Sequence, residues 1–356
     1  MAYTNIDDPS AFFQTTLYTG NGAGSHAITN TGNSDLQPDW LWIKKRNGAV
    51  NHLLHDSVRG VNNLLVSNTT AVDDSNSNIV LGFDSDGFRV GANSASNNNN
   101  DTFVAWQWKA GTSFTNDASS TSVGSIDSAG TVNTDSGFSI ISYTGTGSNG
   151  TIAHGLGAKP NIIINKTRDT TAQMWSFYHS SRGATKHLGL DRQNVEDTGS
   201  AYYQDTEPTS TVFSVGSESA TNHNGAAMIA YCFAEKPGYS KVGSYIGNGN
   251  ANGSFLYTGF KPAWVLVKSS TYAGAWLIWD NKRSTSGGFN TNHYILVPSN
   301  DEAEQQGTNY AIDILSNGFK LRNTNGNVQN SGETMVYIAF AHQPVVTSEG
   351  VPATAF

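Results

Sequence analysis

The amino-acid sequence predicts an all-β protein that contains three tandem antiparallel β-sandwich domains of the jelly-roll type. Apolar runs of about four to six residues, rich in Val, Ile, Trp, Tyr and Phe, are bounded by Gly, Asn, Asp and Pro, which is typical of strands joined by turns. No stretch of the chain keeps a helical period of apolar residues. One set of landmarks also recurs three times along the chain, which indicates repeated domains.

Each copy of the repeated unit opens with an aromatic strand that ends in Gly-x-Gly, and continues to a Pro, an apolar run and a Lys. The Pro-to-Lys spacing is six residues in every copy, and an Arg follows the Pro after 21, 22 and 21 residues. A strand rich in aromatic residues closes each unit, at 103–108, 228–233 and 335–340. The repeated Pro, Lys and Arg are Pro38, Lys44 and Arg59, then Pro160, Lys166 and Arg182, then Pro262, Lys268 and Arg283.

Several strands carry bulky apolar residues on both faces. In 40–43 and 275–279 every position is apolar, which is typical of strands in the centre of a sandwich. Trp175 and Trp276 each stand seven residues before the repeated Arg, and His52 takes that position in the first copy. We therefore expect both tryptophans to be buried between sheets.

The landmarks also divide the chain into domains. The predicted boundaries are 1–111 for the first sandwich with its N-terminal segment, 112–136 for a bridge rich in Ser, Thr and Gly, 137–236 and 237–346 for the second and third sandwiches, and 347–356 for a tail. We expect a short edge hairpin through 122–126 of the bridge. Because almost no spare chain joins the second and third units, we expect a rigid body.

Composition excludes several classes of function. Charged residues make up 13% of the chain, about half the usual share, and the formal net charge is −8. An acidic protein lacks the Lys and Arg excess that nucleic acids and anionic membranes attract, so we expect neither as a partner. No run is long and apolar enough to predict a transmembrane helix, and the first residues do not resemble a secretory signal. A single cysteine, Cys232, excludes a disulfide within the chain and is expected to be buried and inert.

No residue pattern predicts catalysis, a metal site or a cofactor. The Gly-x-Gly sites precede further strands rather than helices, which favours hairpin turns over phosphate loops. Asp84 and Asp86 resemble half of a calcium loop, but the equivalent turns of the other copies lack these acids, which favours a simple turn. The acidic cluster of the second copy does not recur, and loop solvation explains it better than the paired carboxylates of a glycosidase. We therefore expect no catalytic residue and no metal ligand.

The repeated Lys and Arg allow two interpretations. They could contact a ligand, or they could support the fold, with the Arg donating to carbonyl groups at a strand-to-loop corner. A residue kept in three copies of one chain favours the structural role. Aromatic residues in polar loops are better binding candidates, because they stack on sugar rings or dock on other proteins. These candidates are Tyr202, Tyr203, Tyr272 and Tyr310.

The repeated unit resembles a known family of viral domains. Tyr-Thr-Gly-x-Gly, Lys-Pro before an apolar run, Ser-Arg-Gly, and the closing strands at 230–234 and 338–341 look like the repeated β-domain of tailed phages that infect marine bacteria. The resemblance covers about 11–344, and the first copy departs from it most, because its closing strand ends in Trp108 and Lys109. It implies domains similar to concanavalin A-like lectin sandwiches and a structural or tail-fibre-like protein without a catalytic signature.

We therefore expect a non-enzymatic virion protein, located on the tail, on a fibre or as a decoration of the head. Its expected partners are other virion proteins, further copies of itself and a glycan of the host surface, and its expected place is a particle assembled in the host cytoplasm. The alternatives are a tailspike-type protein that binds or degrades polysaccharide, and a free carbohydrate-binding module. We expect the N-terminal segment 1–10 to anchor the chain to the virion and the loop 298–309 to face outward.

Overall fold

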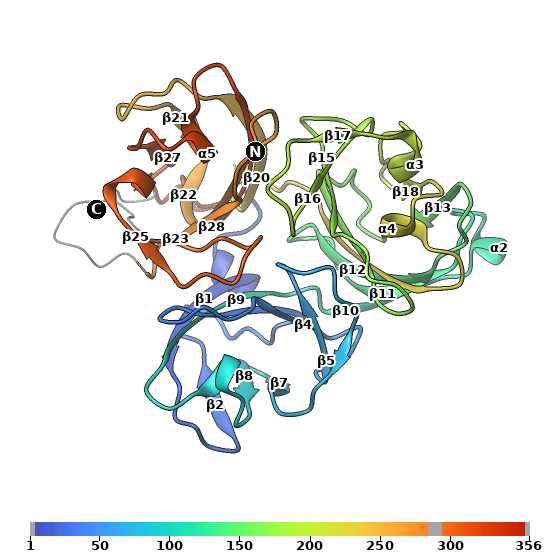
Figure 1. The fold of residues 1–356 in the computed structure, drawn as a ribbon, viewed down its shortest axis with the longest axis horizontal. Coiled ribbons are helices and arrows are strands. Elements are labelled where there is room, and N and C mark those ends of the chain that lie inside the picture. Colours follow the sequence, from blue (N-terminus) through green and yellow to red (C-terminus); the bar gives the residue numbers. More distant parts are fainter. Residues whose placement is uncertain (1–3, 284–293, 353–356) are drawn as a thin grey trace.

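The computed structural model describes residues 4–283 and 294–352, and nearly all of its regular structure is antiparallel β-sheet. The all-β class predicted from the sequence is confirmed. The strands form three sandwich-like repeats, here called repeat 1 (13–108), repeat 2 (138–233) and repeat 3 (240–344), which appear in Figure 1 as three lobes around a common centre.

Repeat 1 contains a larger sheet of order β1-β9-β3-β4-β5-β6 and a smaller sheet of order β2-β8-β7. A short 3-10 helix precedes it and a one-turn helix lies before its last strand. The elements are η1 (Pro9–Ala11), β1 (Phe13–Thr19), β2 (His26–Thr29), β3 (Trp40–Lys45), β4 (Leu53–Asp56), β5 (Asn63–Val66), β6 (Asp74–Ser75), β7 (Val80–Asp84), β8 (Gly87–Val90), α1 (Ser94–Asn97) and β9 (Thr102–Trp108).

Repeat 2 keeps this order in β12-β19-β14-β15-β16-β17, and β13 pairs with β18 in the smaller sheet. The predicted bridge adds β10 and β11 to the edge of the larger sheet, so the hairpin there spans most of the bridge and not only 122–126. The elements are β10 (Thr112–Asn116), α2 (Ala118–Thr121), β11 (Ser128–Asn133), β12 (Phe138–Thr144), β13 (Gly150–Ala153), β14 (Ile162–Thr167), β15 (Ser176–His179), β16 (Lys186–Gly189), β17 (Asp197–Thr198), α3 (Ser200–Tyr203), β18 (Val212–Val215), α4 (Ser219–Asn222) and β19 (Ala227–Phe233).

Repeat 3 again follows the pattern, with sheets of order β20-β28-β22-β23 and β21-β27-β26 and a separate pair β24-β25. The larger-sheet order of the first copy therefore recurs along the chain, which agrees with the spacing of the sequence landmarks. The elements are β20 (Ser240–Ile246), β21 (Phe255–Tyr257), β22 (Phe260–Ser269), β23 (Leu277–Asp280), β24 (Tyr294–Ile295), β25 (Gln305–Gln306), η2 (Thr308–Tyr310), β26 (Ile312–Leu315), β27 (Gly318–Leu321), α5 (Gly326–Gln329) and β28 (Thr334–Pro344).

The repeated Gly-x-Gly packs against the short helix near the end of each repeat. A Cβ atom on the first glycine would lie about 2.2 Å from a backbone carbonyl oxygen just after that helix in every copy, so no side chain fits there. The second glycine has a left-handed backbone, with φ between 65° and 68° in the three copies, which disfavours other residues. These glycines are Gly20 and Gly22, Gly145 and Gly147, and Gly247 and Gly249. The predicted hairpin turn is wrong, because the strands before and after each motif lie in different sheets. The motif is instead a crossing between the two sheets that donates to the short helix of its own repeat.

The central strands of each larger sheet bury both faces, because alternate residues enter two different cores. On β3, Leu41 and Ile43 pack inside repeat 1, whereas Trp40 and Trp42 point toward the other repeats. The same alternation occurs on β9, β14, β19, β22 and β28. The two-sided apolar runs of the sequence therefore reflect one core within a repeat and another between repeats.

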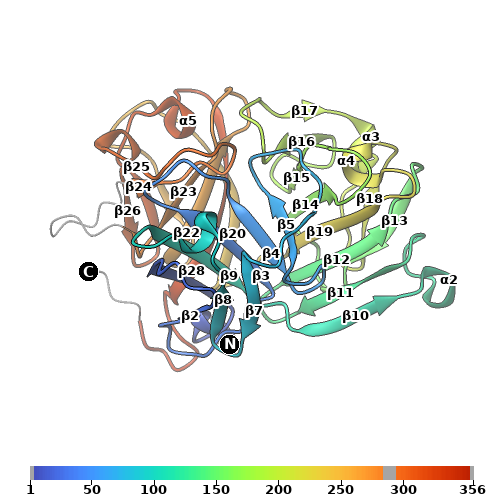
Figure 2. The ribbon, with the colours of Figure 1, turned by 60° about the horizontal axis from the view of Figure 1, so that its bottom comes forward.

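The core between the repeats lies where the three larger sheets face one another (Figures 1 and 2). It is rich in aromatic rings. Trp40 stacks on Tyr231 of repeat 2 with ring centroids 4.6 Å apart, and Trp108 packs edge-on against Trp264 of repeat 3 at 5.6 Å. The small space left at its centre is lined only by apolar side chains. A shared core of this size holds the repeats as one body.

Trp175 and Trp276 are buried, with exposed fractions of 0% and 1%, as the sequence predicted. Both belong to the core between the repeats. Replacing Trp175 by Ala is expected to lower the free energy of unfolding by roughly 3–5 kcal/mol, since it leaves a cavity in a core that cannot collapse onto it. Urea titration followed by tyrosine and tryptophan fluorescence measures this loss. Trp175→Phe is the control, because it retains most of the ring packing, and a loss below about 1 kcal/mol for Trp175→Ala would contradict the role of the ring.

The two segments expected to anchor the chain and to face outward both contact another part of the chain. From Thr4 onward the N-terminal segment packs at the start of repeat 3: Thr4 donates to the carbonyl of Pro237 (2.8 Å), and Phe12 packs on Tyr239. In the loop 298–309, Asp301 and Glu304 contact repeat 1. Both segments thus close the ring between repeat 3 and repeat 1, and their orientation on a particle stays a prediction; residues 1–3 lie outside the described part of the chain.

Candidate functional site

The repeats contact one another through one main-chain hydrogen bond that recurs around the ring. In each case an acidic residue donates its amide to the carbonyl that lies two positions after the repeated Lys of a neighbouring repeat. The bonds run from Asp73 to Arg168 (2.7 Å), from Glu196 to Ser270 (2.8 Å) and from Glu304 to Arg46 (2.8 Å). Repeat 1 thus contacts repeat 2, repeat 2 contacts repeat 3, and repeat 3 contacts repeat 1, which closes the ring.

A second contact also follows the ring. The indole of Trp175 donates to the carbonyl of Val66 (2.9 Å), and that of Trp276 donates to the carbonyl of Gly189 (2.8 Å). In repeat 1 the equivalent position is His52. Its Nδ1 accepts a hydrogen bond from the indole of Trp42, and the carbonyl of Val297 in repeat 3 is its neighbour in the adjoining repeat. The exchange of Trp for His in the first copy therefore retains an N–H group at the same junction.

The repeated arginines form ion pairs with acidic residues beside these contacts between repeats. Arg59 is buried and pairs with Asp56 (2.5 Å) and with Asp73 (2.8 Å), and it also donates to two carbonyl groups. Burial alone would lower the pKa of Arg59, but Asp56 and the other acidic groups nearby hold that pKa above its ordinary value. Arg283 repeats this arrangement with Asp280 (2.5 Å) and Glu304 (3.1 Å).

Repeat 2 lacks the buried Asp that pairs with the repeated Arg, because the residue that faces this position from the adjoining repeat is different. Asp56 accepts a hydrogen bond from Tyr231 in the next repeat (2.6 Å), and Asp280 accepts one from the indole of Trp106 (3.0 Å). In repeat 2 the corresponding neighbour is the apolar Ile338, and the corresponding acid is replaced by His179. Burial lowers the pKa of His179 to about 4, so this side chain is neutral. A carboxylate is thus present only where the adjoining repeat supplies a donor, as burial of charge requires.

Within the described residues, Arg182 consequently forms an ion pair only with Glu196, at 2.5 and 2.6 Å, and it is less buried than the other two arginines. The repeated lysines are fully buried and donate to carbonyl groups: Lys44 to Val50 (2.6 Å) and Asp301 (3.2 Å), Lys166 to Gln173 (2.5 Å) and Thr70 (2.7 Å), and Lys268 to Ser269 (2.6 Å). Burial lowers the pKa of each lysine to about 8. These contacts agree with a structural role for the repeated cations and leave little of their surface for a ligand.

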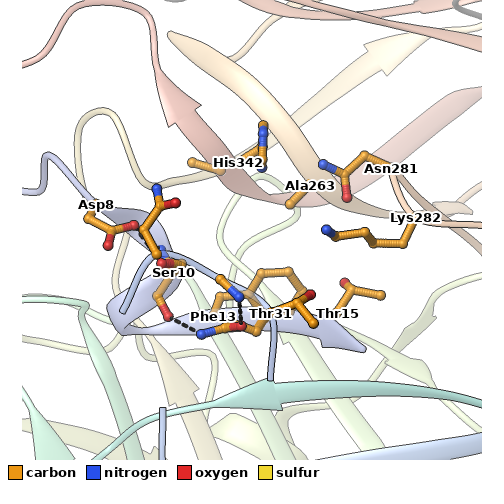
Figure 3. Close-up of a pocket in the computed structure, with 13 residues that line it drawn as sticks. Asp8, Ser10, Phe13, Thr15, Thr31, Ala263, Asn281, Lys282 and His342 are labelled. Atoms are coloured by element: carbon orange, nitrogen blue, oxygen red, sulfur yellow. Dashed lines mark hydrogen bonds between the residues drawn. The ribbon is translucent and has the colours of Figure 1, made fainter. Parts of the chain in front are cut away.

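A pocket with a volume of about 100 Å³ opens where repeat 3 meets repeat 1 (Figure 3). Repeat 1 contributes β1 and the loop around Thr31, and the N-terminal segment contributes Asp8 and Ser10. Repeat 3 contributes Asn281 and Lys282 from the turn after β23, and His342 from the end of β28. Phe13, Ala263 and Ala341 form apolar parts of its wall.

Several polar side chains of this pocket have no partner within the described residues, and Thr15 and Lys282 are two of them. The hydroxyl of Thr15 is buried without a hydrogen bond, although only 6% of this residue is exposed. Lys282 is exposed, and its ammonium group makes no hydrogen bond or ion pair with the described part of the chain. By contrast, the amide of Gln14 is fully used by Ser10, Ser34 and Gly32. The unpartnered groups make this pocket the best candidate for a binding site.

The pocket and the ring lie within one family domain. A model described as a domain of unknown function, DUF7483, matches residues 8–344. The chain belongs to the DUF7483 family. The matched range takes in the segment that closes the ring and all three repeats, so the DUF7483 domain corresponds to the whole three-repeat body and not to one sandwich. No curated protein matches the sequence.

The four tyrosines proposed from the sequence do not form one site. Tyr203 is buried and donates to Asn165, so its expected exposure is wrong: α3 carries it into the core of repeat 2. Tyr202 is half-buried and stacks on His187 with ring centroids 3.5 Å apart. Tyr310 packs against the core of repeat 3, and only Tyr272, 42% exposed, is a free loop aromatic. The polar sequence around Tyr203 concealed its burial, since only its hydroxyl needs polar partners.

Nothing in the described residues favours a metal site. They contain no group of three or more His, Cys, Asp or Glu that could hold an ion. Asp84 pairs with Arg89 (2.9 Å), and Asp86 accepts from the amide of Leu36, so both acids of the calcium-like turn have partners within repeat 1. Cys232 lies in the core of repeat 2, and burial raises the pKa of its thiol. Among the described residues, no helix is long and apolar enough to cross a membrane.

Proposed function

We propose that this chain is a non-enzymatic structural protein of a bacterial virus, which displays three lectin-like, jelly-roll sandwiches for assembly and attachment to the host surface. The observation that carries the proposal is the closed ring of three repeats. A ring closed by buried contacts between segments up to about 260 residues apart presents its loops at fixed positions. The likeness of the repeated unit to domains of tailed phages supports the same function.

The physical properties of the ring suit attachment by many weak contacts. A rigid body loses little conformational entropy when its loops bind, so modest polar and stacking contacts suffice. Exposed aromatics of repeat 3, namely Phe255, Tyr257 and Tyr272, offer such contacts. Several copies on one particle would raise the avidity by roughly 10²–10⁴ without new contacts. The low content of charged residues also suits a protein that is packed beside copies of itself.

The proposal is tested on purified particles of the virus that encodes the chain. Quantitative mass spectrometry of washed, gradient-purified particles should find the chain at a fixed copy number that matches a symmetric position on the tail or head. Cryo-electron microscopy of the same particles should then show the three-lobed body at that position. Absence of the chain from washed particles would contradict the proposal.

A further inference from the structure

We propose that the pocket between repeat 3 and repeat 1 binds the carboxylate of an acidic sugar residue, such as a uronic acid. This inference deepens the proposed attachment function and rests on it only for the biological source of the sugar. The binding itself is a property of the isolated chain. The three junctions between neighbouring repeats, here called seams, differ from one another, and the pocket lies in the one between repeat 3 and repeat 1.

At the seam between repeats 2 and 3, the carboxylate of Glu235 forms hydrogen bonds to the next repeat. Glu235 follows β19 and accepts hydrogen bonds from the ammonium of Lys241 (2.7 Å) and from the amide of Val242 (3.0 Å), both on β20. Glu235 thus joins the end of one larger sheet to the first strand of the next. Its two oxygens accept from one ammonium group and one main-chain amide of the next repeat.

The seam between repeats 1 and 2 also contains a carboxylate. There the acid is Asp39, which precedes β3, and it accepts from the amides of Ala110 (2.8 Å) and Gly111 (2.7 Å). Ser57 donates to the second oxygen of the same group (2.7 Å). Two of the three seams therefore have an acid of the chain at the point where the closing strand ends.

The third seam lacks this acid. Phe340 pairs with Trp264 as Phe233 pairs with Ile162 and Trp108 pairs with Trp40. Counting from these pairs places His342 at the position of Glu235 and Ala263 at the position of Asp39, where β22 and β28 are irregular. Thr15 on β1 takes the position of Val242, whose amide binds Glu235 in the other seam. Where the other two seams hold a hydrogen-bonded, half-buried carboxylate, the third has a pocket instead, with Thr15 on one wall and Lys282 on the other (Figure 3).

The groups without partners match the chemistry of a carboxylate. The ammonium of Lys282 is a donor with a positive charge, and the buried hydroxyl of Thr15 is a donor that no group of the described chain accepts. Asp8, the acid that does line this pocket, is already used: its oxygens accept from Ser10 (2.6 Å) and Ser34 (2.6 Å). An external carboxylate would therefore find two unused donors.

The rest of the pocket favours a sugar over a bare anion. Asn281 and Thr31 offer amide and hydroxyl groups beside the charged end, and Phe13, Ala263 and Ala341 provide apolar surface for the carbon face of a ring. A volume of about 100 Å³ holds a carboxylate and the adjoining edge of one sugar ring, while the remainder stays in solvent. One acidic sugar within a longer polysaccharide could thus bind in the pocket while its neighbours in the polysaccharide stay outside the protein.

Binding is tested with glucuronate, glucose and acetate as separate ligands of the purified full chain, by NMR chemical-shift titration. Glucuronate should bind in the millimolar range, and glucose and acetate should each bind about tenfold more weakly, since one lacks the charge and the other the ring. Lys282→Gln should weaken glucuronate binding by about tenfold or more. Lys159→Gln, which removes the same charge from repeat 2, should leave it within about twofold.

Thr15→Val separates binding from folding. Because the hydroxyl has no partner, its replacement by a methyl group should leave the melting temperature of the free chain unchanged or raised, while glucuronate binding weakens about threefold or more. Failure of glucuronate to bind, or unchanged binding in both Lys282→Gln and Thr15→Val, would overturn the inference. Equal affinity for acetate and glucuronate would overturn the assignment of a sugar. Neither result depends on whether virus particles contain the chain, so the two proposals fail separately.

Discussion

Lowering the pH from about 6.5 to about 4 is expected to unfold the chain. Burial lowers the pKa of His154, His179 and His187 to about 4, and that of His55 to about 3. The same imidazoles have a pKa near 6.5 in an unfolded chain. Between these values the unfolded state binds protons that the folded state excludes, so the free energy of unfolding is fully present above about pH 6.5 and decreases as the pH falls.

The expected effect is large because several histidines act together. At about pH 4 each of these four groups contributes about 3 kcal/mol, so together they reach about 12 kcal/mol, which is comparable to the whole stability of a typical protein. Urea titrations at fixed ionic strength across this pH range measure the slope. His154→Gln removes one titrating group and should make the slope shallower by about one proton. A stability that stays constant between about pH 6.5 and 4.5 would show that these imidazoles reach solvent.

Arg59→Met is expected to lower the free energy of unfolding by about 3–5 kcal/mol. The substitution leaves the buried carboxylate of Asp56 with Tyr231 and a main-chain amide as partners but without a countercharge. It also removes the ion pair with Asp73, which joins repeat 1 to Arg168 of repeat 2. Removal of one member of a buried ion pair is costly because the other charge cannot regain water.

The matched control is Arg182→Met at the equivalent position of repeat 2. There the neighbouring residue is the neutral His179, and Arg182 pairs with Glu196 near the surface, so the expected loss is only about 1 kcal/mol. Chemical denaturation of both variants under the same conditions measures the difference. Tyr231→Phe should lower the free energy of unfolding more in the wild-type background than in the Arg59→Met background. The two losses are not additive because both substitutions act on Asp56. Equal losses for the two arginine variants would contradict the role assigned to the buried pair.

Much of the local structure could be predicted because it depends on neighbours in the sequence. The alternation of Trp40, Leu41, Trp42 and Ile43 indicates a strand with two buried faces wherever that strand lies. The recurrence of Pro, Lys and Arg at fixed spacing indicates that the same arrangement of strands is used three times. For the candidate site, however, these rules predicted loop tyrosines, and one of them, Tyr203, lies in a core.

The sequence by itself thus determined the all-β class, the strands and the threefold recurrence of one unit. Only the tertiary structure decided what covers the second face of each larger sheet, because periodicity shows that a face is apolar but not which partner buries it. Asp56 meets Tyr231 across 175 residues, and Thr15 and Lys282, which are far apart in the sequence, line the same pocket between repeat 1 and repeat 3. Such pairings depend on closure of the ring, and closure depends on the packing of three sheets at once.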